Sequence, residues 1–167
     1  MIELRRADAD DVDFLVELAA HPDVQPFLSP HRARTREDVA AEVERSRAEP
    51  ERFGRLVIRV DGQRAGAMGY ELASERHRIA NLGALAIHPD FRGRRLADDA
   101  ARLLQRHLIL ELGFHRLQLE LYAFNERAQR HAERSGFVRE GGKRKAYRKD
   151  GEWVDSVLYA IVREDLE

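Results

Sequence analysis

The chain has 167 residues, 43% of them hydrophobic and 35% charged, and its formal net charge is -1. These values predict one soluble globular domain, and the near-zero charge argues against a dedicated nucleic-acid binder, which is usually basic. The chain has no cysteine, which excludes disulfides and thiolate nucleophiles, and no apolar run approaches the ~20 residues of a membrane helix. Its first residues are charged and do not resemble a signal peptide, so we expect a cytoplasmic protein without a membrane partner.

The first half of the chain predicts a strand, two helices and a hairpin. Asp8 is the expected N-cap of the first helix, Thr35 with Asp38 resembles a capping box for the second, and Asp61-Gly62 is typical of a hairpin turn. The expected elements are a strand over residues 2–6, a helix over 8–20, an irregular loop over 24–31, a helix over 35–48, and strands over 55–60 and 64–73.

The second half predicts a strand–helix–strand crossover, then a helix and a closing hairpin. Gly113 and Gly136 follow the two helical segments and are expected to end them. The expected elements are a strand over residues 79–87, a helix over 96–112, a strand over 117–124, a helix over 126–135, and strands over 137–148 and 153–163 joined at Asp150-Gly151. This order indicates an α/β (α+β) fold. We expect a mostly antiparallel sheet of about seven strands, with helices on both faces and one parallel crossover between residues 79 and 124.

Residues 82–97 are the most informative stretch, because they combine an apolar strand, a Pro turn, a basic glycine-bearing loop and a helix start. This order places backbone N–H groups and the side chains of Arg92, Arg94 and Arg95 at a helix N-terminus. A helix N-terminus carries unsatisfied donors and a partial positive charge, so it favours a phosphate group. The stretch therefore predicts a site for a phosphorylated cofactor.

Two motifs in this order resemble the GNAT superfamily of N-acetyltransferases over nearly the whole chain. The first is Arg92-Gly93-Arg94-Arg95-Leu96-Ala97 after a strand that ends at Pro89, and the second begins at Asn125 and closes on Gly136-Phe137. The segments around Pro26, around Thr35 and over residues 151–159 resemble the RimJ/RimL-like branch, which acetylates ribosomal proteins. One position departs from the family pattern: Arg95 stands where glycine is usual, although a backbone N–H does not depend on the side chain.

The resemblance implies that acetyl-CoA binds between the parallel strands. In the family, the loop before the helix holds the pyrophosphate, and the preceding strand pairs with the pantetheine arm. The asparagine that begins the second motif forms hydrogen bonds with the amides of that arm. One backbone N–H near the strand end would polarise the thioester carbonyl. The implied cofactor-binding residues are Leu85, Ala86, Ile87, Arg92, Gly93, Arg94, Arg95, Leu96, Ala97, Asn125 and Arg130.

The acid–base residues are harder to assign, because the positions that family members use for a tyrosine and a serine are Ala132 and Ala128 here. A carboxylate of the last hairpin in some related enzymes falls at Tyr147. The candidates for catalysis are Glu71, Glu120, Tyr122 and Tyr147. Structural interpretations stand beside these: Asn125 is also a suitable helix N-cap, and Glu120 is also an ordinary exposed residue of a strand's polar face.

The resemblance implies direct acetyl transfer to a primary amine, with three interpretations left open. The acceptor is a protein N-terminal α-amine or a polyamine or other small amine; alternatively, the chain is a CoA-binding or interaction module with little catalysis, as Ala128, Ala132 and Arg95 would favour. By analogy we expect a homodimer. The histidines show no ligand spacing, so we expect no metal site, and we expect no nucleic-acid partner.

Overall fold

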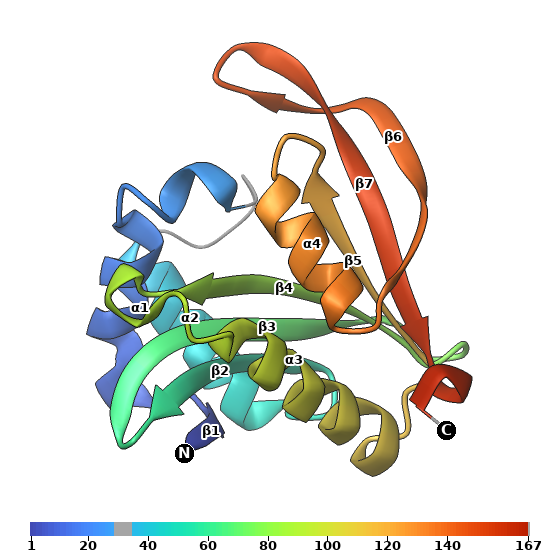
Figure 1. Cartoon of the computed structure of the whole chain (residues 1–167). Helices are drawn as coiled ribbons and strands as arrows, with labels where there is room; N and C mark the ends of the chain where they lie inside the picture. Colours follow the sequence, from blue (N-terminus) through green and yellow to red (C-terminus); the bar gives the residue numbers. More distant parts are fainter. Residues whose placement is uncertain (29–34, 167) are drawn as a thin grey trace.

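The computed structural model describes residues 1–28 and 35–166, and its centre is one sheet of seven strands in the order β1-β2-β3-β4-β5-β7-β6. All neighbouring strands are antiparallel except β4 and β5, which confirms the predicted sheet and its one parallel crossover. The hairpin of β6 and β7 extends beyond the rest of the molecule (Figure 1). The strands are β1 (Ile2–Arg6), β2 (Phe53–Val60), β3 (Gln63–Ser74), β4 (Ile79–Ile87), β5 (Arg116–Tyr122), β6 (Val138–Lys149) and β7 (Glu152–Val162).

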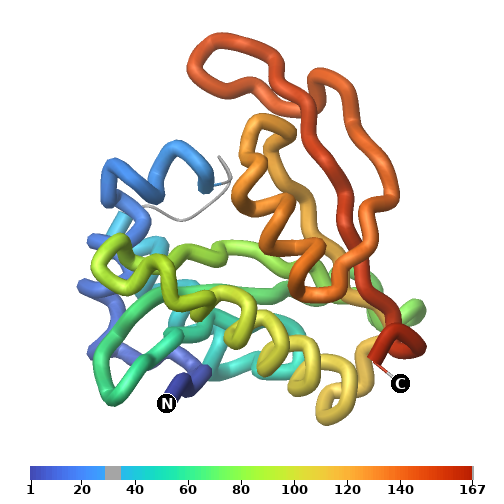
Figure 2. Tube along the Cα trace, viewed as in Figure 1, coloured from blue at the N-terminus to red at the C-terminus, as the bar shows by residue number. Residues whose placement is uncertain are grey.

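The helices cover both faces of the sheet, as predicted. Successive strand residues point to opposite faces, and the apolar ones pack against helices on each side. Ile58 packs in a core with residues of α3 and α4, whereas its neighbour Val57 packs in a second core with residues of α1 and α2. The chain trace follows this layering (Figure 2). The helices are α1 (Val12–Ala20), α2 (Arg36–Ala48), α3 (Leu96–Arg106) and α4 (Glu126–Arg134). Among the described helices, none is long and apolar enough to cross a membrane.

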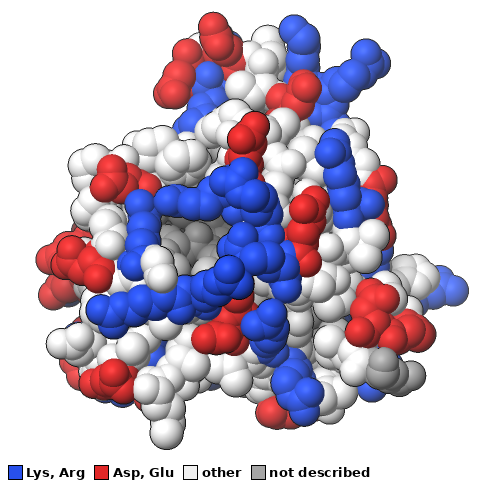
Figure 3. Space-filling view, in the orientation of Figure 1, with Lys and Arg blue, Asp and Glu red and all other residues white. Residues whose placement is uncertain are grey.

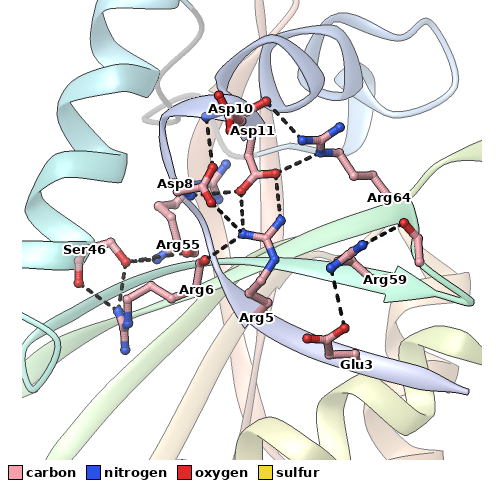
Figure 4. A network of polar contacts seen from close by, with 11 residues as sticks. Glu3, Arg5, Arg6, Asp8, Asp10, Asp11, Ser46, Arg55, Arg59 and Arg64 are labelled. Carbon is pink, nitrogen blue, oxygen red and sulfur yellow. Dashed lines mark hydrogen bonds and ion pairs between the residues drawn. The ribbon is translucent and has the colours of Figure 1, made fainter.

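The entry into α1 is held by a buried carboxylate. Asp8 caps a short 3₁₀ turn (Ala9–Asp11) that leads into α1, and its backbone N–H donates in return to Asp11. Asp11 is fully buried and accepts hydrogen bonds from Arg5 of β1 (2.9 Å to each oxygen) and from Arg64 of β3 (2.8 Å). Figure 4 shows these contacts in one network. The predicted cap at Asp8 is therefore part of a cluster that ties α1 to the sheet.

Three segments differ from the sequence-based expectations. The helix predicted over residues 96–112 is α-helical only to Arg106 and continues as one wider π turn (His107–Glu111), in which the Leu112 N–H donates to the His107 carbonyl (3.1 Å). Apolar periodicity could not reveal this, because Leu108 and Ile109 are both fully buried there. The strand predicted to reach residue 124 ends at Tyr122, in a turn closed by the Asn125 N–H. The loop predicted over residues 24–31 contains a 3₁₀ turn at Gln25–Phe27, and residues 29–31 lie outside the described residues.

The parallel pair opens at one end, and this opening positions the site. Residues Ile79–Asn81 of β4 pair with Arg116–Gln118 of β5, and the described pairing ends there although both strands continue. Gln118 donates to Asn81 (2.8 Å) at the point of divergence. Beyond it, β4 has a bulge at Ala84, whose φ is +58, opposite Met68 of β3. The bulge was not predicted, since alternation along an apolar strand does not mark an extra residue.

Candidate active site

A cavity of about 830 Å³ occupies the opening between β4 and β5. Its walls come from β4 and β5 from Asn81 and Gln118 onward, from the first turns of α3, from α4, and from Lys143 and Tyr147 of β6. This volume lies within the roughly 300–1,000 Å³ typical of small-molecule sites. The cavity thus lies within the sheet itself, because the parallel neighbours β4 and β5 separate there instead of remaining paired.

The basic loop forms one wall of the cavity. Gly93 and Arg95 both adopt left-handed backbone conformations (φ +85 and +56), and Arg95 stands at the N-cap of α3 without a side-chain cap. The first N–H groups of a helix lack intrahelical acceptors and lie at the positive end of its dipole. Positively charged side chains surround a hollow on this face (Figure 3). The wall therefore combines backbone donors with positive charge, as an anion site requires.

Not every predicted arginine reaches the cavity. Arg92 lines it and donates to the Asp23 carbonyl (3.0 Å), and burial together with the nearby Arg127 guanidinium lowers the pKa of Arg92. Arg94 instead lies over the Phe91 ring (5.5 Å to its centroid) and is not among the cavity-lining residues. Arg130 is exposed on α4, 3.9 Å from Glu126, and is not among them either. Arg127, which we did not predict, takes their place on the wall.

The position of Asn125 is compatible with both of its predicted roles, helix N-cap and cofactor contact. Its side chain accepts a hydrogen bond from the Ala128 N–H (3.2 Å), so it is the N-cap of α4, and it also lines the cavity. The other predicted cofactor residues that line the cavity are Leu85, Ala86, Ile87, Gly93, Arg95, Leu96 and Ala97. The structure thus brings together every predicted cofactor residue except Arg94 and Arg130.

Three of the four predicted catalytic residues meet in the cavity. Glu120 Oε2 accepts a hydrogen bond from the Tyr147 hydroxyl, and Lys143 Nζ lies 2.6 Å from Glu120 Oε1. Burial alone would raise the pKa of Glu120, but the hydrogen bonds from Lys143 and Tyr147 outweigh it and lower that pKa. Burial and the Glu120 carboxylate raise the pKa of Tyr147 to about 12. At neutral pH the pair is therefore a carboxylate and a protonated phenol.

Tyr122 and Glu71 have different surroundings. Tyr122 lines the cavity, is mostly buried, stacks on Phe124 (5.1 Å) and meets the Tyr147 ring edge-on (6.1 Å). Glu71 is exposed, pairs with Arg45 of α2 (3.1 Å) and is not among the cavity-lining residues. The structure therefore does not bring Glu71 to the candidate site, although Glu71 of β3 lies opposite Asn81 of β4 in the strand pairing.

A further polar cluster on the cavity wall was not predicted. Asp98, in the first turn of α3, is buried and bonded to His131 Nδ1 (2.6 Å) and Arg134 Nε (2.9 Å) of α4. All three line the cavity, and burial lowers the pKa of His131 despite Asp98. Spacing within α4 could have suggested that His131 and Arg134 share a face, but nothing local to either helix pairs them with Asp98. Across residues 1–28 and 35–166, no group of histidine and acidic side chains is arranged to hold a metal ion.

Comparisons with known proteins agree with this architecture. Residues 2–138 match the acetyltransferase (GNAT) domain family. The spermidine N-acetyltransferase of Vibrio cholerae, solved with CoA and spermine, has a TM-score of 0.85 and 19% identity over 99% of this chain and 98% of that one. The ribosomal-protein-S5-alanine acetyltransferase of Vibrio fischeri has a TM-score of 0.84 and 17% identity over 99% and 95%.

A curated relative extends the comparison to sequence. The SPbeta prophage-derived uncharacterized N-acetyltransferase YokL of Bacillus subtilis is 30% identical over 83 residues. That match covers 50% of this chain and 47% of the relative, so the chain spans about half the length of the curated protein it matches. The solved structures share the fold at low identity, whereas the family match covers most of the chain and includes the basic loop and α4. On that match, the chain belongs to the GNAT acetyltransferase domain family.

Proposed function

We propose that this chain is an acetyl-CoA-dependent N-acetyltransferase that transfers the acetyl group directly to a primary amine. The observation that carries the proposal is the opening of the parallel pair at Asn81 and Gln118. It produces a cavity that is lined both by a basic helix N-terminus and by a partly buried carboxylate, Glu120. A donor with phosphates at one end and a reactive thioester at the other fits such a cavity.

The part of the cavity around the N-terminus of α3 has hydrogen-bond donors suited to the phosphates of coenzyme A. The N-terminus of α3 with Arg92 and Arg127 supports binding of phosphates, because an anion between the two guanidinium groups relieves their mutual repulsion. The β4 edge beyond Asn81 has no described ladder partner on the β5 side, which suits an extended amide-bearing arm. Asn125 lines the same cavity, and we assign its side-chain amide N–H groups to that arm, because its oxygen already caps α4.

We assign catalytic roles to two residues of the cavity wall, Glu120 and Tyr147. An amine attacks only in its neutral form, so a base must remove a proton from the bound ammonium. Glu120 is ionised and is the carboxylate we assign to this step, directly or through water. Tyr147 keeps its proton at neutral pH and is the acid we assign to the departing thiolate. Acetyl-CoA supplies the activated acetyl group, and the usual family positions Ala128 and Ala132 supply neither function.

Two acceptor classes follow from different observations. A protein α-amine has a pKa near ~8 and a polyamine amine one near ~10. Because the pKa of Glu120 is lowered, it is a weak base, and this favours the α-amine and the RimJ/RimL-like assignment. The fold shared with a spermidine acetyltransferase favours the polyamine. A CoA-binding module with little catalysis is the remaining alternative, and it rests on the alanines at positions 128 and 132.

Titration calorimetry with acetyl-CoA tests the proposal. We expect roughly micromolar binding, about tenfold weaker in Arg92→Ala and unchanged in Arg94→Ala, a matched control from the same loop outside the cavity. Turnover is then measured with an alanine-initiated peptide and with spermidine. Binding without turnover of any amine would favour the binding module, and absence of binding would contradict the proposal.

The assembly and location of the chain are also proposals. The β6–β7 hairpin exposes Val138 (57%) and Trp153 (59%), and β6 is an edge strand of the sheet, which supports a homodimer through this hairpin. Light scattering on the purified chain, with Trp153→Ser beside it, distinguishes a dimer from a monomer. A cytoplasmic location remains the sequence-based prediction.

A further inference from the structure

The three lysines of the chain, Lys143, Lys145 and Lys149, all lie on β6, where the remaining cations are arginines. Elsewhere the chain uses arginine as its positive residue, and a guanidinium group cannot act as a nucleophilic amine. The lysines are thus concentrated on the strand that contributes a wall to the cavity. Of the three, only Lys143 is among the cavity-lining residues.

An irregularity in β6 separates Lys143 from the other two. Lys143 pairs with Ser156 and Tyr147 with Val154, so four steps along β6 match two along β7. Lys145 lies in the resulting bulge, with φ +49 and its N–H donating to Asp155 (2.7 Å). Because of the extra residues, Lys143 and Tyr147 both reach Glu120, whereas Lys145 does not share their contacts.

The Lys143 amine contacts Glu120 in the way expected of the amine that accepts the acetyl group. Its Nζ lies 2.6 Å from the carboxylate to which we assign proton removal, while its side chain remains 56% exposed and so is free to move. Glu120 is only 22% exposed and cannot leave the cavity wall. An amine at the end of a long flexible side chain is therefore already bound where an external ammonium would bind.

We propose that Lys143 is an internal acceptor, acetylated at Nζ within the same molecule. The inference rests on the proposed acetyltransferase function. In the step, the Lys143 ammonium gives one proton to Glu120 or to water, its nitrogen forms a bond to the thioester carbonyl carbon, and the carbon–sulfur bond breaks. The thiolate leaves with the electron pair and takes a proton from Tyr147, which regains one from solvent; the amide nitrogen releases its second proton. No oxidant or reductant is needed.

The modification has a consequence for external acceptors. An acetylated lysine has no charge, so Glu120 would lose the cation that now pairs with it. An external ammonium then no longer competes with Lys143 for the carboxylate. Self-acetylation is therefore expected to lower the KM for amine acceptors by several-fold.

Mass spectrometry of the full chain incubated with acetyl-CoA tests the inference, with peptide fragmentation to locate the added acetyl groups. We expect Lys143 to be acetylated at least tenfold faster than Lys145, which measures the uncatalysed background on the same strand, and faster than Lys149, whose Nζ lies over the Tyr122 ring (5.4 Å to its centroid). The rate per molecule should not change on tenfold dilution of the protein. Lys143→Arg, which keeps the positive charge, should lose the fast acetylation, and the matched control Lys145→Arg should keep it.

The outcomes separate the two proposals. Equal labelling of the three lysines, or a rate that falls in proportion to protein concentration, would overturn internal acetylation. If spermidine or the peptide is acetylated in the same sample while Lys143 is not, the enzyme assignment holds and this inference is wrong. If acetyl-CoA does not bind at all, the proposed function fails and the inference fails with it.

Discussion

Asp11 and Glu120 are two shielded carboxylates held by cations, but their surroundings differ. Asp11 is fully buried, and its oxygens are occupied by Arg5, Arg64 and the Asp8 N–H (Figure 4). Its two cations, Arg5 of β1 and Arg64 of β3, are 27% and 41% exposed. Glu120 is partly exposed and lines a cavity of about 830 Å³, and its cation Lys143 is 56% exposed.

The two ion pairs therefore differ in whether the carboxylate remains accessible to another group. A buried carboxylate that fixed neighbours satisfy on every side has no room for a ligand, so its charge contributes to stability. A carboxylate whose partner can move aside, next to a cavity, keeps its charge available to another cation. Lowered pKa values occur at both positions, so the shift alone does not identify a functional site.

The largest expected effect is on catalysis at Glu120. Glu120→Gln keeps the shape and the hydrogen bond from Tyr147 but removes the carboxylate that we propose as the base, so kcat at neutral pH should fall on the order of 10²-fold. The free energy of unfolding should change by less than about 1 kcal/mol, because Lys143 becomes solvated. Steady-state kinetics and urea denaturation measure the two quantities.

Glu71→Gln is the matched control for this variant. Glu71 was a sequence-based candidate, yet it pairs with Arg45 on the protein surface, outside the cavity lining. We expect its kcat to equal that of the unmodified chain. A fall in Glu71→Gln as large as in Glu120→Gln would show that the cavity does not contain the base.

The next effect, at Asp11, is expected on stability and not on catalysis. Its pKa is lowered to about 2, since the hydrogen bonds from Arg5, Asp8 and Arg64 outweigh the effect of burial. A lowering of this size corresponds to roughly 2.5 kcal/mol of stability at neutral pH. Asp11→Asn should therefore unfold at lower urea concentration, with kcat per folded molecule unchanged.

The pH dependence of that difference follows from the direction of the shift. A carboxylate with a lowered folded-state pKa contributes its full stability above its unfolded pKa and loses it as pH falls toward the folded value. The difference between the unmodified chain and Asp11→Asn should thus be constant above about pH 5 and roughly halved by pH 3. A difference that persists unchanged at pH 3 would mean that Asp11 is not held as a charged group.

The sequence predicted the fold and the cofactor wall better than it predicted the chemistry. The basic loop and Asn125 were identifiable because their motifs are local: a strand, a turn and a helix start follow one another in the chain. Lys143 and the pair of Asp98 with His131 were missed, because each contact joins elements separated by 23 to 33 residues. The bulges at Ala84 and Lys145, which determine where side chains point, leave no mark in an alternation pattern.

The smallest expected effect concerns Arg95, where family proteins usually have glycine. Its left-handed backbone (φ +56, ψ +29) costs an L-residue about 1 kcal/mol, and glycine removes that cost while adding entropy to the unfolded chain. Arg95→Gly should therefore raise the free energy of unfolding by roughly 0.5 kcal/mol. Because Arg95 lines the cavity, the same variant should bind acetyl-CoA about threefold more weakly, whereas Arg95→Lys should retain the affinity by keeping the charge. Denaturation and calorimetry measure the two effects separately. A gain in stability without a loss of affinity would show that Arg95 supports the loop at a conformational cost and takes no part in holding phosphate.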